Sequence, residues 1–176
     1  MASFVRTAGT DLGAVNDTIW VANRLAGVSA IRGFDAATGD VVRTVPLTPN
    51  SQPGDLAYAK GKLYVAEEFG NPQAVPEPIP PAVAIVDVET GAILKRIFFR
   101  SEPPFTASTG WRPHHVHASV GGNLVAVGLY GTDLVAVIDT RDDSLIGPWD
   151  SNLDTVNGRI HAAVFSKDGN TLYLLK

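Results

Sequence analysis

The chain has 176 residues, of which 45% are hydrophobic and 18% are charged. This composition is typical of a globular protein with its own core and excludes a disordered polypeptide. The net charge is −4 and the basic residues are scattered singly, so we do not expect a nucleic-acid partner. No apolar run approaches the ~20 residues of a membrane-spanning helix, so we do not expect membrane insertion. The absence of cysteine excludes disulfides and thiolate metal ligands.

The first unit of a repeat covers about residues 10–47. We expect an inner strand in 10–16 (TDLGAVN), a tight turn, and a buried strand in 16–23 (NDTIWVAN). Two outer strands follow in 33–47 (GFDAATGDVVRTVPL), joined by a D-x-x-T-G turn. In such a turn the aspartate binds its own backbone and the glycine supplies a positive φ.

The same pattern returns with its turn aspartates 52 residues apart, at Asp35, Asp87 and Asp139. We assign these aspartates a structural role. The further units cover about residues 53–99, 113–149 and, for the start of a fourth, 158–176.

A repeat of this length, with four short strands and no helical periodicity, predicts an all-β fold of the β-propeller class. The chain would form one partial propeller domain of about three and a half four-stranded blades. Because a half-ring exposes blade faces and sheet edges, we expect missing blades or a second protomer to close the ring.

Two pairs of segments resemble a known family. IWVAN with GFDAATGDVVRTV, and LYVAE with IVDVETGAILKRI, resemble the YVTN-type, WD40-like repeats of bacterial propellers. The resemblance extends over nearly the whole chain and implies a fragment of a seven-bladed ring. It also implies a bacterial protein located in the periplasm or secreted, although no signal peptide is visible in this chain.

The long connections are expected on one face of the ring. The loop 69–81 contains five prolines, and the connection 101–113 carries Trp111. Arg24 and Glu68 follow second strands at this same face, so we count all three side chains as ligand-binding candidates. Long loops on a rigid scaffold commonly carry binding sites, but they can also cover a neighbouring blade or be tolerated insertions.

All four histidines lie near this face, at His114, His115, His117 and His161. Alignment of the turn glycines puts His114 and His161 at equivalent places on inner strands of neighbouring blades, near the channel mouth. Three interpretations remain open. They are a divalent metal site with Glu67 or Glu68 as carboxylate ligand, metal-free acid–base chemistry, and structural hydrogen bonds to loops.

The segment RPHHVHASVGGNLVAVGLYGTD also resembles the P-H-x-H…L-G-x-D stretch of seven-bladed lactonase propellers. One extra residue separates the two matching histidines, and Tyr130 interrupts the L-G pair. The resemblance implies four site residues: Arg112, His114, His117 and Asp133.

The sequence therefore favours a binding or scaffold protein whose loop-bearing face holds a small ligand, a metal or a protein partner. The alternative is a propeller enzyme, either a lactonase-like hydrolase or a metal- or cofactor-dependent oxidoreductase. Propellers of this kind carry unrelated activities, so the resemblance does not choose between them. A divalent metal is the one cofactor that the histidines suggest.

Overall fold

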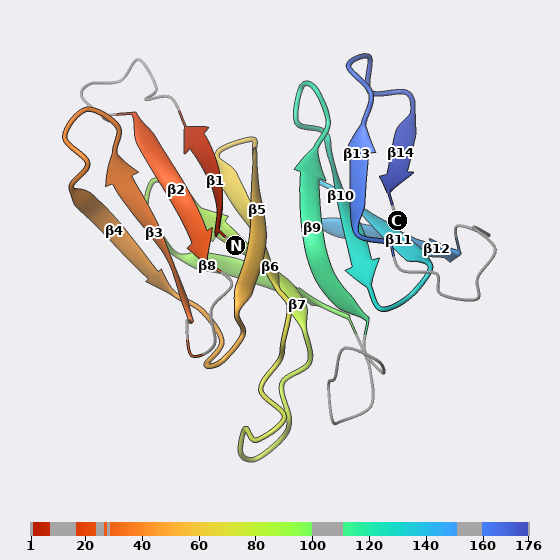
Figure 1. Cartoon of the computed structure of the whole chain (residues 1–176), viewed down its shortest axis with the longest axis horizontal. Helices are drawn as coiled ribbons and strands as arrows, with labels where there is room; N and C mark the ends of the chain where they lie inside the picture. Colours follow the sequence, from red (N-terminus) through yellow and green to blue (C-terminus); the bar gives the residue numbers. More distant parts are fainter. Residues whose placement is uncertain are drawn as a thin grey trace.

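The computed structural model describes residues 2–7, 17–23, 27, 29–99, 111–150 and 160–175. These residues form strands and turns with no helix, arranged as three four-stranded sheets and one two-stranded sheet (Figure 1). No helix in the described ranges is long and apolar enough to cross a membrane.

The first sheet contains β1 (Ala2–Thr7), β2 (Thr18–Asn23), β3 (Ala30–Asp35) and β4 (Val41–Pro46). The strand that pairs with β2 is β1, with Thr7 opposite Thr18. The sequence predicted this inner strand in 10–16, which lies outside the described residues. The correction has a physical reason: residues 2–7 contain phenylalanine, valine and threonine, whereas 10–16 contain aspartate, glycine and asparagine, which strands disfavour.

The second sheet contains β5 (Pro53–Ala59), β6 (Lys62–Glu67), β7 (Ala82–Asp87) and β8 (Ile93–Phe98). The third contains β9 (Arg112–Ala118), β10 (Leu124–Tyr130), β11 (Leu134–Asp139) and β12 (Ser144–Asp150). The last is the hairpin of β13 (Ala162–Phe165) and β14 (Leu172–Leu175). In every sheet, strands adjacent in sequence pair antiparallel, as they do in a propeller blade.

The turns between the third and fourth strands explain the repeated aspartates. The carboxylate oxygen Oδ1 of each accepts a backbone N–H from the turn that it begins, at Asp35, Asp87 and Asp139. Gly39 and Gly91 supply the positive φ values, 78° and 75°. In the third sheet Asp143 takes that position with a φ of 57°, so the third turn places a carboxylate where the other two have no side chain.

Neighbouring sheets pack face to face, and their inner strands β1, β5, β9 and β13 lie next to one another (Figure 1). One apolar cluster fills each of the three junctions between consecutive sheets. This succession of stacked sheets with adjoining inner strands is the arrangement of propeller blades.

An aromatic side chain of the second strand is buried in each of the first two junctions. Trp20 on β2 is 1% exposed and Tyr64 on β6 is 0% exposed. On β14, Leu172 and Leu174 pack against the third sheet, so Tyr173 between them points the opposite way and is 58% exposed. The outward face of the hairpin is therefore uncovered by the described part of the chain.

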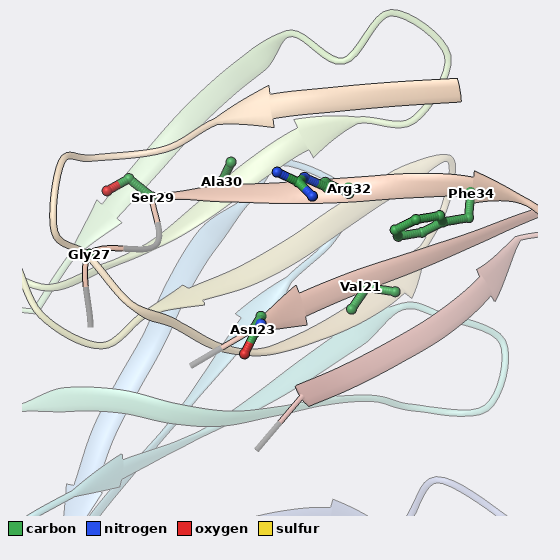
Figure 2. Close-up of a pocket in the computed structure, with 7 residues that line it drawn as sticks. All are labelled: Val21, Asn23, Gly27, Ser29, Ala30, Arg32 and Phe34. Atoms are coloured by element: carbon green, nitrogen blue, oxygen red, sulfur yellow. The ribbon is translucent and has the colours of Figure 1, made fainter. Parts of the chain in front are cut away.

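The other end of the row of sheets is also open. A hollow of about 380 Å³ lies on the outward face of the first sheet (Figure 2). It is lined by residues of β2, β3 and the segment that joins them: Val21, Asn23, Gly27, Ser29, Ala30, Arg32 and Phe34.

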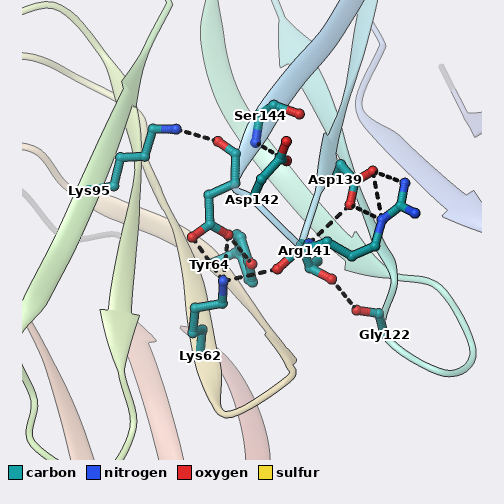
Figure 3. A network of polar contacts seen from close by, with 10 residues as sticks. Lys62, Tyr64, Lys95, Gly122, Asp139, Arg141, Asp142 and Ser144 are labelled. Carbon is teal, nitrogen blue, oxygen red and sulfur yellow. Dashed lines mark hydrogen bonds and ion pairs between the residues drawn. The ribbon is translucent and has the colours of Figure 1, made fainter.

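Polar contacts connect β6 and β8 of the second sheet to the turn between β11 and β12 of the third (Figure 3). The carboxylate of Asp143 accepts hydrogen bonds from Lys62 Nζ at 2.7 Å and from the Tyr64 hydroxyl at 2.6 Å. Lys95 Nζ donates to the Asp143 carbonyl at 2.6 Å. Burial and the Asp143 hydrogen bond raise the pKa of Tyr64 far above its ordinary value, so this phenol stays protonated and donates.

Candidate functional site

The imidazole of His114 is held by a buried carboxylate. His114 lies on the inner strand β9, and Glu68 directly follows β6 of the preceding sheet. Their closest atoms, His114 Nδ1 and Glu68 Oε1, are 2.7 Å apart, and Glu68 is 0% exposed. The Glu68 carboxylate can only accept a hydrogen bond, so in neutral His114 the proton is on Nδ1, which donates, and Nε2 is left as an acceptor.

Backbone space for this carboxylate comes from Gly54 on β5. A Cβ at this position would lie 2.2 Å from Glu68 Oε1, so any side chain there would displace the carboxylate from His114. The glycine therefore takes part in the site although it carries no functional group. Sequence reasoning missed it because one glycine among 17 carries no distinguishing signal.

Arg112, at the start of β9, lies beside the same carboxylate. Its Nη1 atom is 3.9 Å from Glu68 Oε2, and the residue is 1% exposed. Its guanidinium carbon lies 4.6 Å from the ring centroid of Phe69 and 4.9 Å from that of Tyr130. The arginine is thus held between two aromatic rings, an arrangement in which cation–π attraction partly replaces the lost hydration.

His161 completes the cluster from the fourth sheet. Its ring centroid lies 4.7 Å from that of His114, with the two rings at 79° to each other. It also lies 6.2 Å from the Tyr130 ring and is exposed. The structure therefore brings His114 and His161 together, as the equivalence of the two inner strands predicted. We call Glu68, Arg112, His114, Tyr130 and His161 the mouth cluster.

His115 and His117 lie on β9 beside His114 and have other partners. His117 Nδ1 accepts the backbone N–H of Phe165 at 3.2 Å, which connects the third sheet to β13. His115 Nε2 lies 3.5 Å from Asp55 Oδ2. Burial lowers the pKa of both histidines, and for His115 the charge of Asp55 opposes that effect. Both side chains therefore have structural contacts, and each of these contacts crosses a blade junction, to β5 for His115 and to β13 for His117.

Glu67 is committed to the scaffold. Its Oε1 accepts the Thr48 amide at 2.7 Å and its Oε2 accepts Arg96 Nε at 2.9 Å. Across the described ranges, no group of three histidine, aspartate or glutamate side chains is arranged to hold a metal ion. The predicted metal site thus gains no support, because His117 and Glu67 already bind other groups.

The remaining candidates differ in their placement. Trp111 is exposed and directly precedes β9. Asp133 lies in the turn between β10 and β11, and its buried Oδ1 has no hydrogen-bond partner in the part of the chain that is described. Arg24 lies outside the described residues. Of the set implied by the lactonase resemblance, Arg112 and His114 lie together, whereas His117 binds β13 instead.

Two aromatic members of the site were not predicted. Phe69 begins the proline-rich loop, which is closed by hydrogen bonds in both directions between Asn71 and Ile79. Tyr130 ends β10 and, in the sequence, was noted only because it interrupts the L-G pair of the lactonase-like stretch. The available signal was an aromatic residue at or just after the end of two second strands. This signal does not predict which way the rings point.

The comparisons with known proteins identify a fold. No family model matches the sequence, and no curated protein does. The structure is similar to the crystal structure of Sqt1 from Saccharomyces cerevisiae, a WD40 β-propeller, with a TM-score of 0.65 and 15% sequence identity. The match covers 99% of this chain and 42% of Sqt1, so the chain spans less than half of the Sqt1 length. The all-β propeller prediction is confirmed: the described residues form three four-stranded blades and a two-stranded one of a partial β-propeller.

Proposed function

We propose that this chain is a binding propeller whose mouth cluster holds a small polar molecule that carries a flat ring. One observation carries the proposal. A carboxylate and a guanidinium, 0% and 1% exposed, lie together beside the His114 imidazole, at a blade junction that also contains a large apolar cluster. Burying charges in this way costs more stability than apolar packing of the same volume, so a buried charged pair next to an open rim suggests a functional role.

The chemistry of the cluster suggests the ligand class. Glu68 fixes His114 so that its Nε2 can accept a hydrogen bond, and the exposed His161 offers a second imidazole 4.7 Å away. The Tyr130 ring adds an aromatic face beside His114, and the exposed Trp111 directly precedes β9, the strand that carries His114. Polar tips beside aromatic faces suit a sugar or heteroaromatic ring. A loop of a protein partner that presents such a ring is the other occupant in keeping with a scaffold role.

The test is a binding screen with histidine side-chain NMR as the readout. We would add monosaccharides, nucleosides and aromatic carboxylates to the purified chain and follow the imidazole signals. We expect at least one class to shift His114 and His161 saturably, and His114→Ala to remove that response. The matched control is His117→Gln, which changes a histidine of the same strand outside the mouth cluster and should bind normally. Equal responses of both variants, or no response from any class, would overturn the proposal.

A hydrolase is the second candidate, favoured by the Glu68–His114 pair itself. A buried carboxylate that orients an imidazole is the arrangement of a general base, which could activate water on a lactone or ester. Glu68→Gln would then abolish hydrolysis of a test lactone while leaving the fold intact. Without any turnover in the parent chain, this candidate is rejected. The YVTN-type assignment and the location outside the cytoplasm stay predictions of the sequence motifs alone.

A further inference from the structure

The two junctions within the first three sheets are built from the same parts. In each, an aromatic residue of a second strand shares an apolar cluster with four residues of the next sheet. Trp20 has this relation to Leu63, Val65, Ala84 and Val86. Tyr64 has it to Val125, Val127, Ala136 and Ile138. The receiving positions lie on the second and third strands of the following sheet in both cases.

The first sheet has the same four receiving positions, and no described residue covers them. Strand pairing sets the equivalence, because Thr18 pairs with Asp35 as Lys62 pairs with Asp87. The equivalents are therefore Ile19, Val21, Arg32 and Phe34. In the second sheet these positions are fully buried, whereas Val21 and Phe34 are half-buried and Arg32 is exposed.

A hollow lies where an incoming aromatic side chain would sit. Its volume is about 380 Å³, and Figure 2 shows Val21, Arg32 and Phe34 on its walls. A phenol ring placed between Val21 and Phe34 would bury its apolar edge there. The guanidinium of Arg32, which replaces the alanine of the second sheet, could then lie over the ring.

The hairpin at the other end presents such a side chain. Tyr173 occupies the place on β14 that Trp20 and Tyr64 occupy on their strands, and it is 58% exposed. Leu175, two residues further on the same face, is 51% exposed. These two side chains form an apolar, aromatic surface on the outward face of the hairpin.

We propose that two copies of this chain associate head to tail, with Tyr173 of each copy in the first-sheet hollow of its partner. The described residues of each copy form four sheets, so those of two copies form eight, and propellers close with about four to eight blades. The inserting and receiving surfaces differ, so the contact is heterologous and needs a closed ring to end at two chains. The inference is independent of the mouth cluster.

The test is the oligomeric state of the purified chain by sedimentation velocity and light scattering. We expect a dimer for the parent chain and monomers for Phe34→Asp and Tyr173→Ser alone. In a dimer of either variant, each junction between the two copies would contain the altered hollow or the altered tyrosine position. An equimolar mixture of the two variants should restore association. One chain then supplies an intact tyrosine and the other an intact hollow, which gives a heterodimer with one junction.

The controls separate loss of contact from loss of folding. Val75→Asp changes an exposed apolar residue of the proline-rich loop and should leave the dimer unchanged. Arg32→Glu, at an exposed position, should weaken the dimer even if Phe34→Asp proves unstable. A monomeric parent chain would overturn the proposal and point to a blade from another polypeptide as the occupant. Dimers from both single variants, or no association in the mixture, would also overturn it.

Discussion

His117 makes one hydrogen bond that depends on its protonation state. Its Nδ1 atom accepts the Phe165 N–H, so it can do this only while it carries no proton. Burial, with a smaller effect of His115, holds the pKa of His117 below its ordinary value of 6.5. The unfolded chain therefore binds more protons than the folded one when the pH falls below about 6.5.

We expect the melting temperature to fall by a few degrees as the pH is lowered from about 7.5 to about 5.5. The stabilisation is complete above the ordinary pKa and is lost as the pH falls through the lowered one. Calorimetry at the two pH values measures the difference. His117→Gln can accept the same N–H without titrating, so its pH dependence should be smaller. His115, whose pKa burial also lowers, would account for the remainder. Identical pH dependence in the two proteins would contradict this account.

At the scale of elements, the third turn has become part of a blade junction. Asp143 stands at the position of Gly39 and Gly91, and its carboxylate binds Lys62 and Tyr64 of the preceding sheet. The turn therefore keeps its left-handed residue and adds two contacts. In the first junction the corresponding connection is a single hydrogen bond, from the Arg43 guanidinium to the Thr90 carbonyl.

Asp143→Asn tests how much this contact contributes. Asparagine tolerates a positive φ nearly as well as aspartate, so the change mainly removes the charge that Lys62 faces. We expect a loss of about 1–3 kcal/mol in the free energy of unfolding, measured by urea denaturation. Asp142→Asn is the matched control, because Asp142 is exposed and its hydrogen bond is to Ser144 in its own turn. Equal losses for the two variants would show that the contacts of the Asp143 carboxylate across the junction add no stability.

The elements themselves could be predicted because their signals are local. An aspartate that binds its own turn marks all three pairs of outer strands, and a glycine with positive φ marks the first two of them. The inner strand β1 was misplaced because the segment 10–16 directly precedes β2, as the inner strands of the other sheets precede their second strands, although residues 2–7 have the stronger strand-forming composition. Only pairing with β2 selects between them, and that pairing is a non-local contact.

The candidate site could be predicted in part. Equivalent places on adjacent inner strands were enough to anticipate the proximity of His114 and His161. The contact of His114 with Glu68 and the aromatic rings around Arg112 depend on how one sheet is stacked on the next. The orientation of one sheet on the next is set by the whole apolar junction between them, and no short sequence pattern encodes it. The same limit explains why Glu67 seemed a ligand although Arg96 and Thr48 bind it.

At the scale of the molecule, the chain is a row of sheets in which each one contacts only its neighbours. Stability in such a row is shared between the sheets and their junctions. Both faces of the second and third sheets are covered, whereas the first sheet and the β13–β14 hairpin each have one face that no described residue covers.

This uneven coverage should appear as a gradient of backbone opening along the chain. In the monomeric Phe34→Asp variant, we expect amide hydrogens of β6, β7, β10 and β11 to exchange with deuterium most slowly. Those of β14 should exchange fastest, because local opening there breaks one interface and one ladder. Mass spectrometry of peptides after timed labelling would measure the order. Uniform protection along the row would mean that all sheets open together as a single cooperative unit.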